Sequence, residues 1–389
     1  MAGHNVLIVS ASTGTGHIRA GEAVREALGQ HSPEASVRHV DLLSLAPGWV
    51  RRGYGTGYEL MASRAPWAWE RVYRHTDGDG TDHARWSGFA DHVLFREFRQ
   101  LLLSRRWDVV VSTHFLPCQL AAGKPGMPPF ALSITDFTVH RFWVQPRVGR
   151  YFVATDDVAA DLRRRLPAAR VDVTGIPISP LTATGIPRLE ARSRLGMDPE
   201  RSVVMVAGGG LGLGVVEMTR SVLAGAPADV QIVAVCGRNE AAREALSSLD
   251  LPAERLRVMG YVTGMEAYLA ASDVVVTKPG GLTTSEALAI GRPLVLTLPI
   301  PGQETGNTRA LVAAGAALPA LSDRELREVT ERIFTRPELR RELEASARRI
   351  GRPRSALDVA ERISREYLTP ARRRSGLPVS PGEGVVRVP

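Results

Sequence analysis

Two histidines and one aspartate in the first half of the chain each follow a short apolar run, which is where parallel α/β folds place reactive side chains. They are His17, His114 and Asp136. Because the carboxyl ends of parallel strands meet at one edge of a sheet, we expect these side chains to face a single cleft. An imidazole there can take a proton near neutral pH, and a carboxylate can orient the imidazole or act as the base itself. A histidine with only a structural hydrogen bond fits the same positions.

A glycine-rich turn immediately precedes His17. The segment Gly14-Thr-Gly-His ends an apolar run and begins a helical pattern. Gly14 and Gly16 let the backbone approach a ligand closely, and the first N–H groups of the helix are free to bind an anion or a polar group. The turn is not a dinucleotide-binding fingerprint, because Arg19 stands where that pattern needs its third glycine. It is not a P-loop either, since neither Gly-Lys-Ser nor Gly-Lys-Thr occurs in the chain.

The second half contains two further glycine-rich segments, of which the second could hold a diphosphate. One is Gly208-Gly-Gly-Leu-Gly-Leu-Gly, and the other is Thr277-Lys-Pro-Gly-Gly, which leads into a helix expected from about 283 to 290. The free N–H groups and the dipole at the start of that helix favour a phosphate group. Lys278 either adds positive charge there or is solvated.

Four polar residues around and beyond this turn each have two interpretations. Thr283-Thr-Ser-Glu fits a capping box, in which Glu286 only reaches back to the cap amide, but the same carboxylate could accept hydrogen bonds from both hydroxyls of a ribose. Gln303, Glu304 and Asn307 lie in one polar segment whose amides and carboxylate suit a polyol such as a hexose. The alternative is an exposed loop in which Asn307 or Thr305 caps the next helix. The pattern alone leaves these alternatives open.

Short apolar runs that alternate with helical patterns must position these residues. Such runs indicate parallel sheets covered on both faces, and the two glycine-rich openings about 200 residues apart indicate two similar α/β domains with a cleft between them. We predict a first domain at 1–175, a second at 176–355, a closing helix at 356–370 and a disordered basic tail at 371–389. The expected strands are 5–10, 36–41, 108–112, 130–134, 151–154, 202–207, 231–236, 257–259, 273–277 and 293–298.

Composition and charge exclude several classes of protein. The 389 residues are 44% hydrophobic and 23% charged, which is typical of a soluble globular chain. The formal net charge of +8 favours anionic partners, but no helix-turn-helix, RNA-recognition signature or zinc spacing supports nucleic-acid binding. Two cysteines are too few for a disulfide framework or a zinc site. With no signal peptide or spanning segment apparent, we expect a cytoplasmic protein that meets membranes only peripherally.

Residues 45–100 form an insertion in which aromatic side chains and arginines are interleaved. One interpretation is a helical subdomain with an aromatic core. The other is an interfacial patch, in which Trp and Tyr lie at headgroup depth and Arg meets lipid phosphates. The candidate lipid-facing residues are Pro47, Trp49, Arg51, Arg52, Trp67 and Trp69.

The ordered motifs resemble those of the diacylglycerol glycosyltransferases, which include monogalactosyldiacylglycerol synthases and processive diacylglycerol glucosyltransferases. The chain is more distantly similar to the N-acetylglucosaminyltransferase that forms lipid II. The resemblance spans about residues 5–365. The motifs that carry it are Gly14-x-Gly-His, Ser112-Thr-His-Phe, Thr135-Asp-Phe, Tyr151-Phe-Val-Ala-Thr-Asp, Gly175-Ile-Pro-Ile, Cys236-Gly-Arg-Asn, Thr277-Lys-Pro-Gly-Gly and Pro301-Gly-Gln-Glu-x-x-Asn.

The resemblance implies the GT-B architecture of two Rossmann-like domains, with a UDP-sugar held mainly by the second. It implies that His17 lies beside the acceptor hydroxyl, that Glu286 meets the ribose and that Gln303 and Glu304 contact the hexose. Tyr261 and Val262 would lie near the uracil. The remaining donor-binding residues on this basis are Gly209, Gly210, Arg238, Lys278, Gly280, Gly281, Thr283 and Asn307.

Together these features predict an inverting transfer of glucose or galactose from a UDP-sugar to diacylglycerol, without a metal or other cofactor. His17 is the first choice of base, with Asp136 orienting it or replacing it and His114 as a third candidate. The partners we expect are UDP-glucose or UDP-galactose and a diacylglycerol in the anionic inner face of the cell membrane. The alternatives are a polyprenyl-linked or soluble natural-product acceptor, or an inactive sensor of UDP-sugars.

Overall fold

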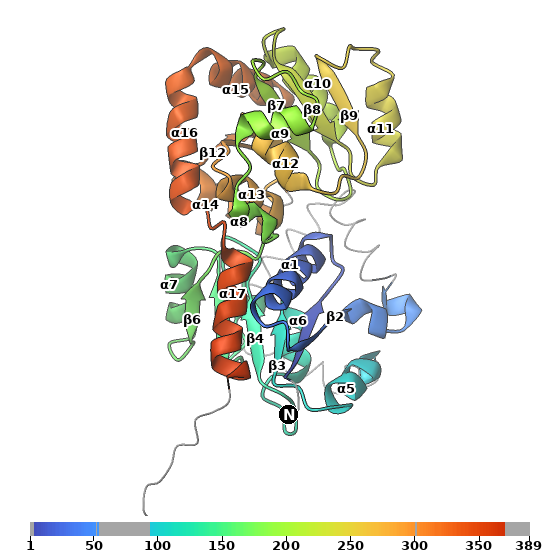
Figure 1. Cartoon of the computed structure of the whole chain (residues 1–389), viewed down its shortest axis with the longest axis vertical. Coiled ribbons are helices and arrows are strands. Elements are labelled where there is room, and N and C mark those ends of the chain that lie inside the picture. Colours follow the sequence, from blue (N-terminus) through green and yellow to red (C-terminus); the bar gives the residue numbers. More distant parts are fainter. Residues whose placement is uncertain (1–3, 52, 54–93, 300–301, 370–389) are drawn as a thin grey trace, which may run out of the picture.

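The computed structural model of the chain describes residues 4–51, 53, 94–299 and 302–369, and it contains two six-stranded parallel sheets, one in each lobe of the molecule (Figure 1). The strand orders are β2-β1-β3-β4-β5-β6 and β12-β11-β10-β7-β8-β9. The second order is that of the Rossmann fold. In each sheet the order in which successive strands are added reverses at one point, which lies between β1 and β3 in the first sheet and between β7 and β10 in the second. The predicted fold class is therefore confirmed.

Most strands are short and apolar, as is typical of parallel sheets with helices on both faces. The first sheet contains β1 (Asn5–Ser10), β2 (Ser36–Asp41), β3 (Val109–Ser112), β4 (Phe130–Ser133), β5 (Arg150–Val153) and β6 (Val171–Val173). The second contains β7 (Val203–Ala207), β8 (Gln231–Val235), β9 (Leu256–Met259), β10 (Val274–Thr277), β11 (Leu294–Thr297) and β12 (Ala317–Ala320).

The helices of the first lobe are α1 (Gly16–His31), η1 (Leu42–Leu45), α5 (Arg96–Leu103), α6 (Phe115–Ala121), η3 (Arg141–Trp143) and α7 (Asp156–Arg165). Those of the second lobe are α8 (Leu181–Thr184), α9 (Arg188–Arg194), α10 (Val215–Gly225), α11 (Glu240–Ser247), α12 (Met265–Ala271), α13 (Gly281–Ala289), α14 (Gln303–Ala313), α15 (Asp323–Thr335) and α16 (Pro337–Ile350). No helix among the described residues has the length and apolar character needed to cross a membrane.

The last helical segment returns to the first lobe. Helix α17 (Ser355–Ile363) and the turn η4 (Ser364–Leu368) pack beside α1 (Figure 1), and Val359 and Ile363 join the apolar core formed with β1. The chain therefore crosses between the lobes twice, and the two crossings lie side by side. The Ile178 N–H donates to Ser355 Oγ at 3.2 Å, and a side chain on Gly175 would collide with Arg352.

The ten predicted strands are present with bounds that differ by at most one residue at either end, but the sequence prediction missed β6 and β12. β12 contains Pro319, which lacks a backbone donor. A proline is tolerated there because β12 is an edge strand and pairs only with β11. Helix α13 begins at Gly281, about two residues before the predicted start.

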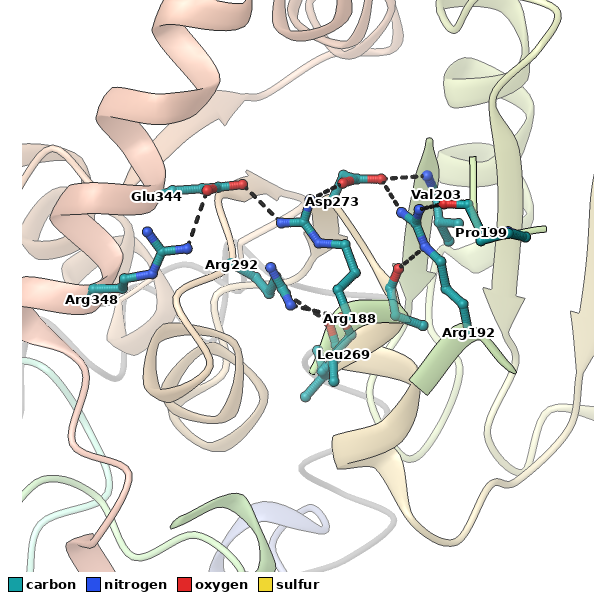
Figure 2. A network of polar contacts seen from close by, with 11 residues as sticks. Arg188, Arg192, Pro199, Val203, Leu269, Asp273, Arg292, Glu344 and Arg348 are labelled. Atoms are coloured by element: carbon teal, nitrogen blue, oxygen red, sulfur yellow. Dashed lines mark hydrogen bonds and ion pairs between the residues drawn. The ribbon is translucent and has the colours of Figure 1, made fainter. Parts of the chain in front are cut away.

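A network of arginines and carboxylates ties α9 and α16 to the second sheet (Figure 2). At its centre, Asp273 accepts hydrogen bonds from Arg192 at 2.6 Å and from the Val203 N–H at 2.7 Å, and it pairs with Arg188 at 2.7 Å. Arg188 also pairs with Glu344 on α16. The nearby Arg292 donates to two backbone carbonyls, and its burial, with Arg188 close by, lowers its pKa to about 10. Buried charged side chains such as these are stable only while they keep their hydrogen-bond and ion-pair partners.

We therefore predict that Asp273→Asn lowers the free energy of unfolding by about 3–5 kcal/mol, because it leaves the buried Arg192 without a counter-charge. Denaturant unfolding measures this value. The matched control is Glu190→Gln, which breaks the exposed pair with Arg194 and should cost no more than about 1 kcal/mol. Equal losses in the two variants would contradict the prediction.

Candidate active site between the two lobes

A cavity of about 520 Å³ lies between the lobes, at the carboxyl ends of the strands where each sheet reverses. A cavity of this size is typical of small-molecule binding sites. His17 and Asp136 line it from the first lobe, whereas Gly209, Gly280 and Gln303 line it from the second. Residues predicted from distant parts of the sequence are thus brought together.

Thr113 holds His17 in a defined orientation. The Nδ1 atom of His17 lies 2.9 Å from the Thr113 carbonyl oxygen and 3.0 Å from Thr135 Oγ1, while Thr113 Oγ1 donates to the His17 carbonyl at 2.8 Å. A carbonyl oxygen can only accept, so Nδ1 carries the hydrogen and the lone pair of the neutral ring is on Nε2. Burial lowers the pKa of His17, although the charge of Asp136 and the Thr113 bond oppose that shift. The ring is therefore neutral at pH 7 and able to accept a proton at Nε2.

Thr113 is itself held from behind. Its hydroxyl lies 2.8 Å from Ser10 Oγ, which in turn lies 2.8 Å from His39 Nε2. Helix α1 packs closely onto these groups because Gly21 has no side chain. A side chain at that position would collide with Ser10 and His39. The sequence placed Thr113 and Thr135 in motifs but assigned them no role, although each directly precedes a residue singled out at a strand end.

His114 lines the cavity, but its ring also caps helix α6. Its Nδ1 accepts the Leu116 N–H at 3.1 Å, so its lone pair is already used. Its ring packs edge-on against His17, with centroids 4.8 Å apart, and burial holds its pKa well below the usual range. The expectation that His114 serves as a catalytic base is therefore corrected to a structural role.

Asp136 does not bond to His17 in the described structure. Its Oδ2 accepts from the Trp143 indole at 3.1 Å, and its Oδ1 accepts from Gln303 Nε2 at 2.6 Å and from Asn307 Nδ2 at 3.3 Å. The hydrogen bond that orients His17 therefore comes from Thr113 and not from Asp136, and the alternative that Asp136 is itself the base stays a prediction. The charge of Asp136 still acts on His17 by raising its pKa.

The start of α13 lies at the cavity, and the first N–H groups of a helix have no partner within the helix. Gly280, Gly281 and Thr283 line the cavity there, together with the Gly208–Gly210 loop that follows β7. Lys278 pairs with Glu304 at 3.5 Å, and both side chains are largely buried. The alternative of a solvated Lys278 is therefore wrong, and a positive charge lies beside the amides of α13.

Glu286 does not form a capping box. Because α13 begins at Gly281, Thr283 lies inside the helix and cannot be its cap. Glu286 Oε1 instead pairs with Arg19 of the first lobe at 2.8 Å, and the buried Oε2 has no hydrogen-bond partner among the described residues. Burial raises the pKa of Glu286, and the charge of Arg19 opposes the rise. Contact with a ribose stays a prediction.

Asn307 is completely buried, and its side chain braces the two lobes against each other. Its Oδ1 accepts the Phe137 N–H at 2.8 Å, and its Nδ2 donates to the Pro279 carbonyl at 3.0 Å as well as to Asp136. The expectation that Asn307 binds the donor directly is corrected, because its amide is already occupied. In contrast, Tyr261 lines the cavity with Val262, and the Arg238 guanidinium lies 5.4 Å from the Tyr261 ring centroid.

The predicted acceptor side divides into two groups. Gly14 and Gly16 line the cavity, whereas Pro47, Trp49 and Arg51 are exposed outside it, with 65% of Trp49 accessible to solvent. Phe95 and Phe98 from the insertion are buried in the same apolar core as Leu7 and Val110 of the first sheet, and so they do not belong to a separate aromatic core. Arg52, Trp67, Trp69 and the tail at 371–389 lie outside the described residues.

Metal binding was not expected, and the described part of the chain contains no group of three or more His, Cys, Asp or Glu side chains arranged to hold a metal ion. Transfer without a metal stays a prediction.

Comparison with known proteins identifies two families in the order of the two lobes. Residues 17–178 match "Monogalactosyldiacylglycerol (MGDG) synthase", and residues 203–349 match "Glycosyltransferase family 28 C-terminal domain". A probable monogalactosyldiacylglycerol synthase 2 of Oryza sativa subsp. indica is 30% identical over 95% of this chain and 82% of its own length. The chain belongs to the monogalactosyldiacylglycerol synthase family.

The chain spans less than two thirds of the length of two other relatives. The monogalactosyldiacylglycerol synthase 1 of Arabidopsis thaliana is 30% identical over 85% of this chain and 64% of its own length. The processive diacylglycerol beta-glucosyltransferase of Bacillus subtilis is 36% identical over 48% of this chain and 49% of its own length. Among solved structures, the MurG of Acinetobacter baumannii covers 94% of this chain with all of its own, at 18% identity and a TM-score of 0.56. That likeness shows the shared two-domain fold.

The packing of α13 against the first lobe gives a prediction about how the lobes meet. A side chain on Gly281 would collide with the Thr135 carbonyl, so Gly281→Ala should lower the free energy of unfolding by about 1–3 kcal/mol and open the cleft. Denaturant unfolding and the radius of gyration from small-angle scattering measure the two effects. Gly280→Ala is the control, because that position is open. The prediction fails if the two variants behave alike.

Proposed function

We propose that this protein transfers glucose or galactose from its UDP-sugar to the free hydroxyl of diacylglycerol, with inversion at the anomeric carbon. One observation carries the proposal: a neutral histidine with its Nε2 lone pair available lines the same cavity as the amide-rich start of α13. Membership of the monogalactosyldiacylglycerol synthase family supports the donor and acceptor classes.

His17 acts as the general base in the proposed reaction. Its Nε2 removes the proton of the acceptor hydroxyl as that oxygen attacks the anomeric carbon from the face opposite the UDP. The imidazolium that forms is stabilised by the charge of Asp136, which already raises the pKa of His17. The Thr113 carbonyl keeps its bond to Nδ1–H throughout, so the ring does not reorient when it is protonated.

The second lobe binds the donor and stabilises the leaving group. As the bond to the anomeric carbon breaks, negative charge grows on the diphosphate, and the fixed N–H groups at the start of α13 stabilise it without reorganising. Lys278 adds positive charge beside them. Gln303 and Glu304 contact the hexose, Tyr261 and Val262 lie near the uracil, and Glu286 meets the ribose.

The acceptor reaches the cavity from a membrane surface. Trp49 and Arg51 are exposed on the first lobe, and this combination suits an interface where an aromatic ring lies at headgroup depth and a guanidinium meets lipid phosphate. We propose that the protein acts as a peripheral protein on the cytoplasmic face of the cell membrane, where diacylglycerol is available.

The first prediction concerns His17. His17→Ala should lower kcat by about 10²–10⁴-fold, because the base is lost, while the affinity for UDP measured by calorimetry stays unchanged. His31 is an exposed histidine at the other end of α1, and His31→Ala is the control, which should leave kcat unchanged. Because the pKa of His17 is lowered from 6.5, the wild-type rate should stay level at neutral pH and fall only as acid protonates the ring. An equal loss of kcat and UDP affinity would argue against the role of base.

The second prediction concerns the substrates. Purified protein supplied with labelled UDP-glucose or UDP-galactose and vesicles of dioleoylglycerol in anionic phospholipid should form a labelled glycolipid that chromatography separates from the donor. Transfer should weaken at high salt, because salt screens the attraction to the membrane. Product from a polyprenyl phosphate or a soluble alcohol, with none from diacylglycerol, would reject the proposed acceptor.

A further inference from the structure

We propose that Asp136 is a positioning residue that holds Gln303 across the cleft, so that Gln303 offers its Oε1 atom to a hydroxyl of the donor hexose. This inference rests on the proposed function, since it specifies how the donor site distinguishes its sugar. It gives Asp136 a task different from the one expected from the sequence, which was to act on or in place of His17.

The contacts of Asp136 determine which way the Gln303 amide points. A carboxylate can only accept hydrogen bonds, so the Gln303 atom that lies 2.6 Å from Asp136 Oδ1 is the donor Nε2. The other end of the same amide, Oε1, must then point away from Asp136. Both residues line the cavity, and Asp136 is only 2% exposed, so the pair lies where a charge-assisted hydrogen bond is strong.

Neighbouring contacts make this arrangement rigid. Gln303 begins α14, and Asn307 lies one turn later, where it bonds to Asp136, to the Phe137 N–H and to the Pro279 carbonyl. Between them, Gly306 packs so closely on Thr138 that a side chain there would collide with it. One face of α14 is therefore fixed to the segment that follows β4 of the other lobe.

This geometry makes hexose recognition depend on the first lobe as well as the second. Gln303 presents a carbonyl oxygen and Glu304 presents a carboxylate, so both are suited to accept hydrogen bonds from sugar hydroxyls. A hydroxyl replaced by fluorine cannot donate a hydrogen bond. Loss of one such bond inside a closed site costs about ten- to hundredfold in affinity.

Asp136→Asn tests the orientation because Asp136 accepts on both sides. The Trp143 indole N–H can only donate, whereas Asn307 Nδ2 loses a longer bond of 3.3 Å to position 136 and keeps the Pro279 carbonyl. We therefore expect the oxygen of an asparagine to face Trp143 and its NH₂ group to face Gln303. Gln303 then has to turn its Oε1 toward position 136 and its NH₂ group toward the sugar. The variant should lose discrimination against the fluorinated sugar while it keeps its affinity for UDP.

Two further variants complete the design. Gln303→Glu alone places two carboxylates against each other and should weaken binding of the UDP-hexose. The double variant Asp136→Asn with Gln303→Glu pairs an NH₂ donor with a carboxylate and leaves the second carboxylate oxygen toward the sugar, so discrimination should return. Gln303→Ala removes the Oε1 atom that contacts the hexose hydroxyl. This variant should abolish discrimination against the analogue fluorinated at that hydroxyl, although Asp136 is intact. Asp157→Asn, an exposed aspartate on α7, is the matched control.

The experiment measures affinity by calorimetry for UDP, for UDP-glucose and UDP-galactose, and for their analogues with a single fluorine in place of the 3-, 4- or 6-hydroxyl. The wild type should bind at least one analogue about tenfold or more weakly than the parent sugar nucleotide, Asp136→Asn should bind the two equally, and the double variant should restore the difference. The inference is overturned if the wild type rejects no analogue, if Asp136→Asn keeps the wild-type pattern, or if the double variant gains nothing over its single variants. Absence of any UDP-hexose binding by the wild type would overturn the proposed function as well.

Discussion

The structure depends on a close backbone contact between the lobes, where Gly281 at the start of α13 meets the carbonyl of Thr135 after β4. A glycine is needed there because any side chain would hold the lobes apart. This contact brings the positive end of a helix in one lobe next to the histidine-bearing edge of the other. The cavity, the pair of Arg19 with Glu286 and the bonds from Asp136 to α14 all lie around it.

Around this contact, hydrogen bonds settle the chemical state of each polar group. His17 carries its hydrogen on Nδ1 because the Thr113 carbonyl demands a donor, and His114 uses its lone pair because the Leu116 N–H demands an acceptor. Of these two adjacent imidazoles, only that of His17 keeps a lone pair that can accept a proton. Burial keeps both rings neutral, which avoids two like charges 4.8 Å apart.

Sequence alone predicted most of the sheet framework. Buried parallel strands are continuous apolar runs, so ten of the twelve could be placed; β6 was missed because Asp172 interrupts it, and β12 because of Pro319. Position at a strand end also identified His17 and Asp136 as cavity residues. The partner of each polar group could not be predicted, because Asp136 and Gln303 are 167 residues apart and Arg19 and Glu286 are 267 apart. Spacing carries no information about such pairs, and local alternatives such as the capping box then compete on equal terms.

The return of α17 to the first lobe has a mechanical consequence. Two connecting segments of the chain run side by side between the lobes. The hydrogen bond from the Ile178 N–H to Ser355 joins them, and Gly175 packs against Arg352. A single connecting segment would allow one lobe to rotate about it relative to the other. Two adjacent segments resist that rotation, so relative motion of the lobes is favoured as bending in one plane. If the cleft opens by bending in that plane, the residues contributed by the two lobes return to the same register when it closes.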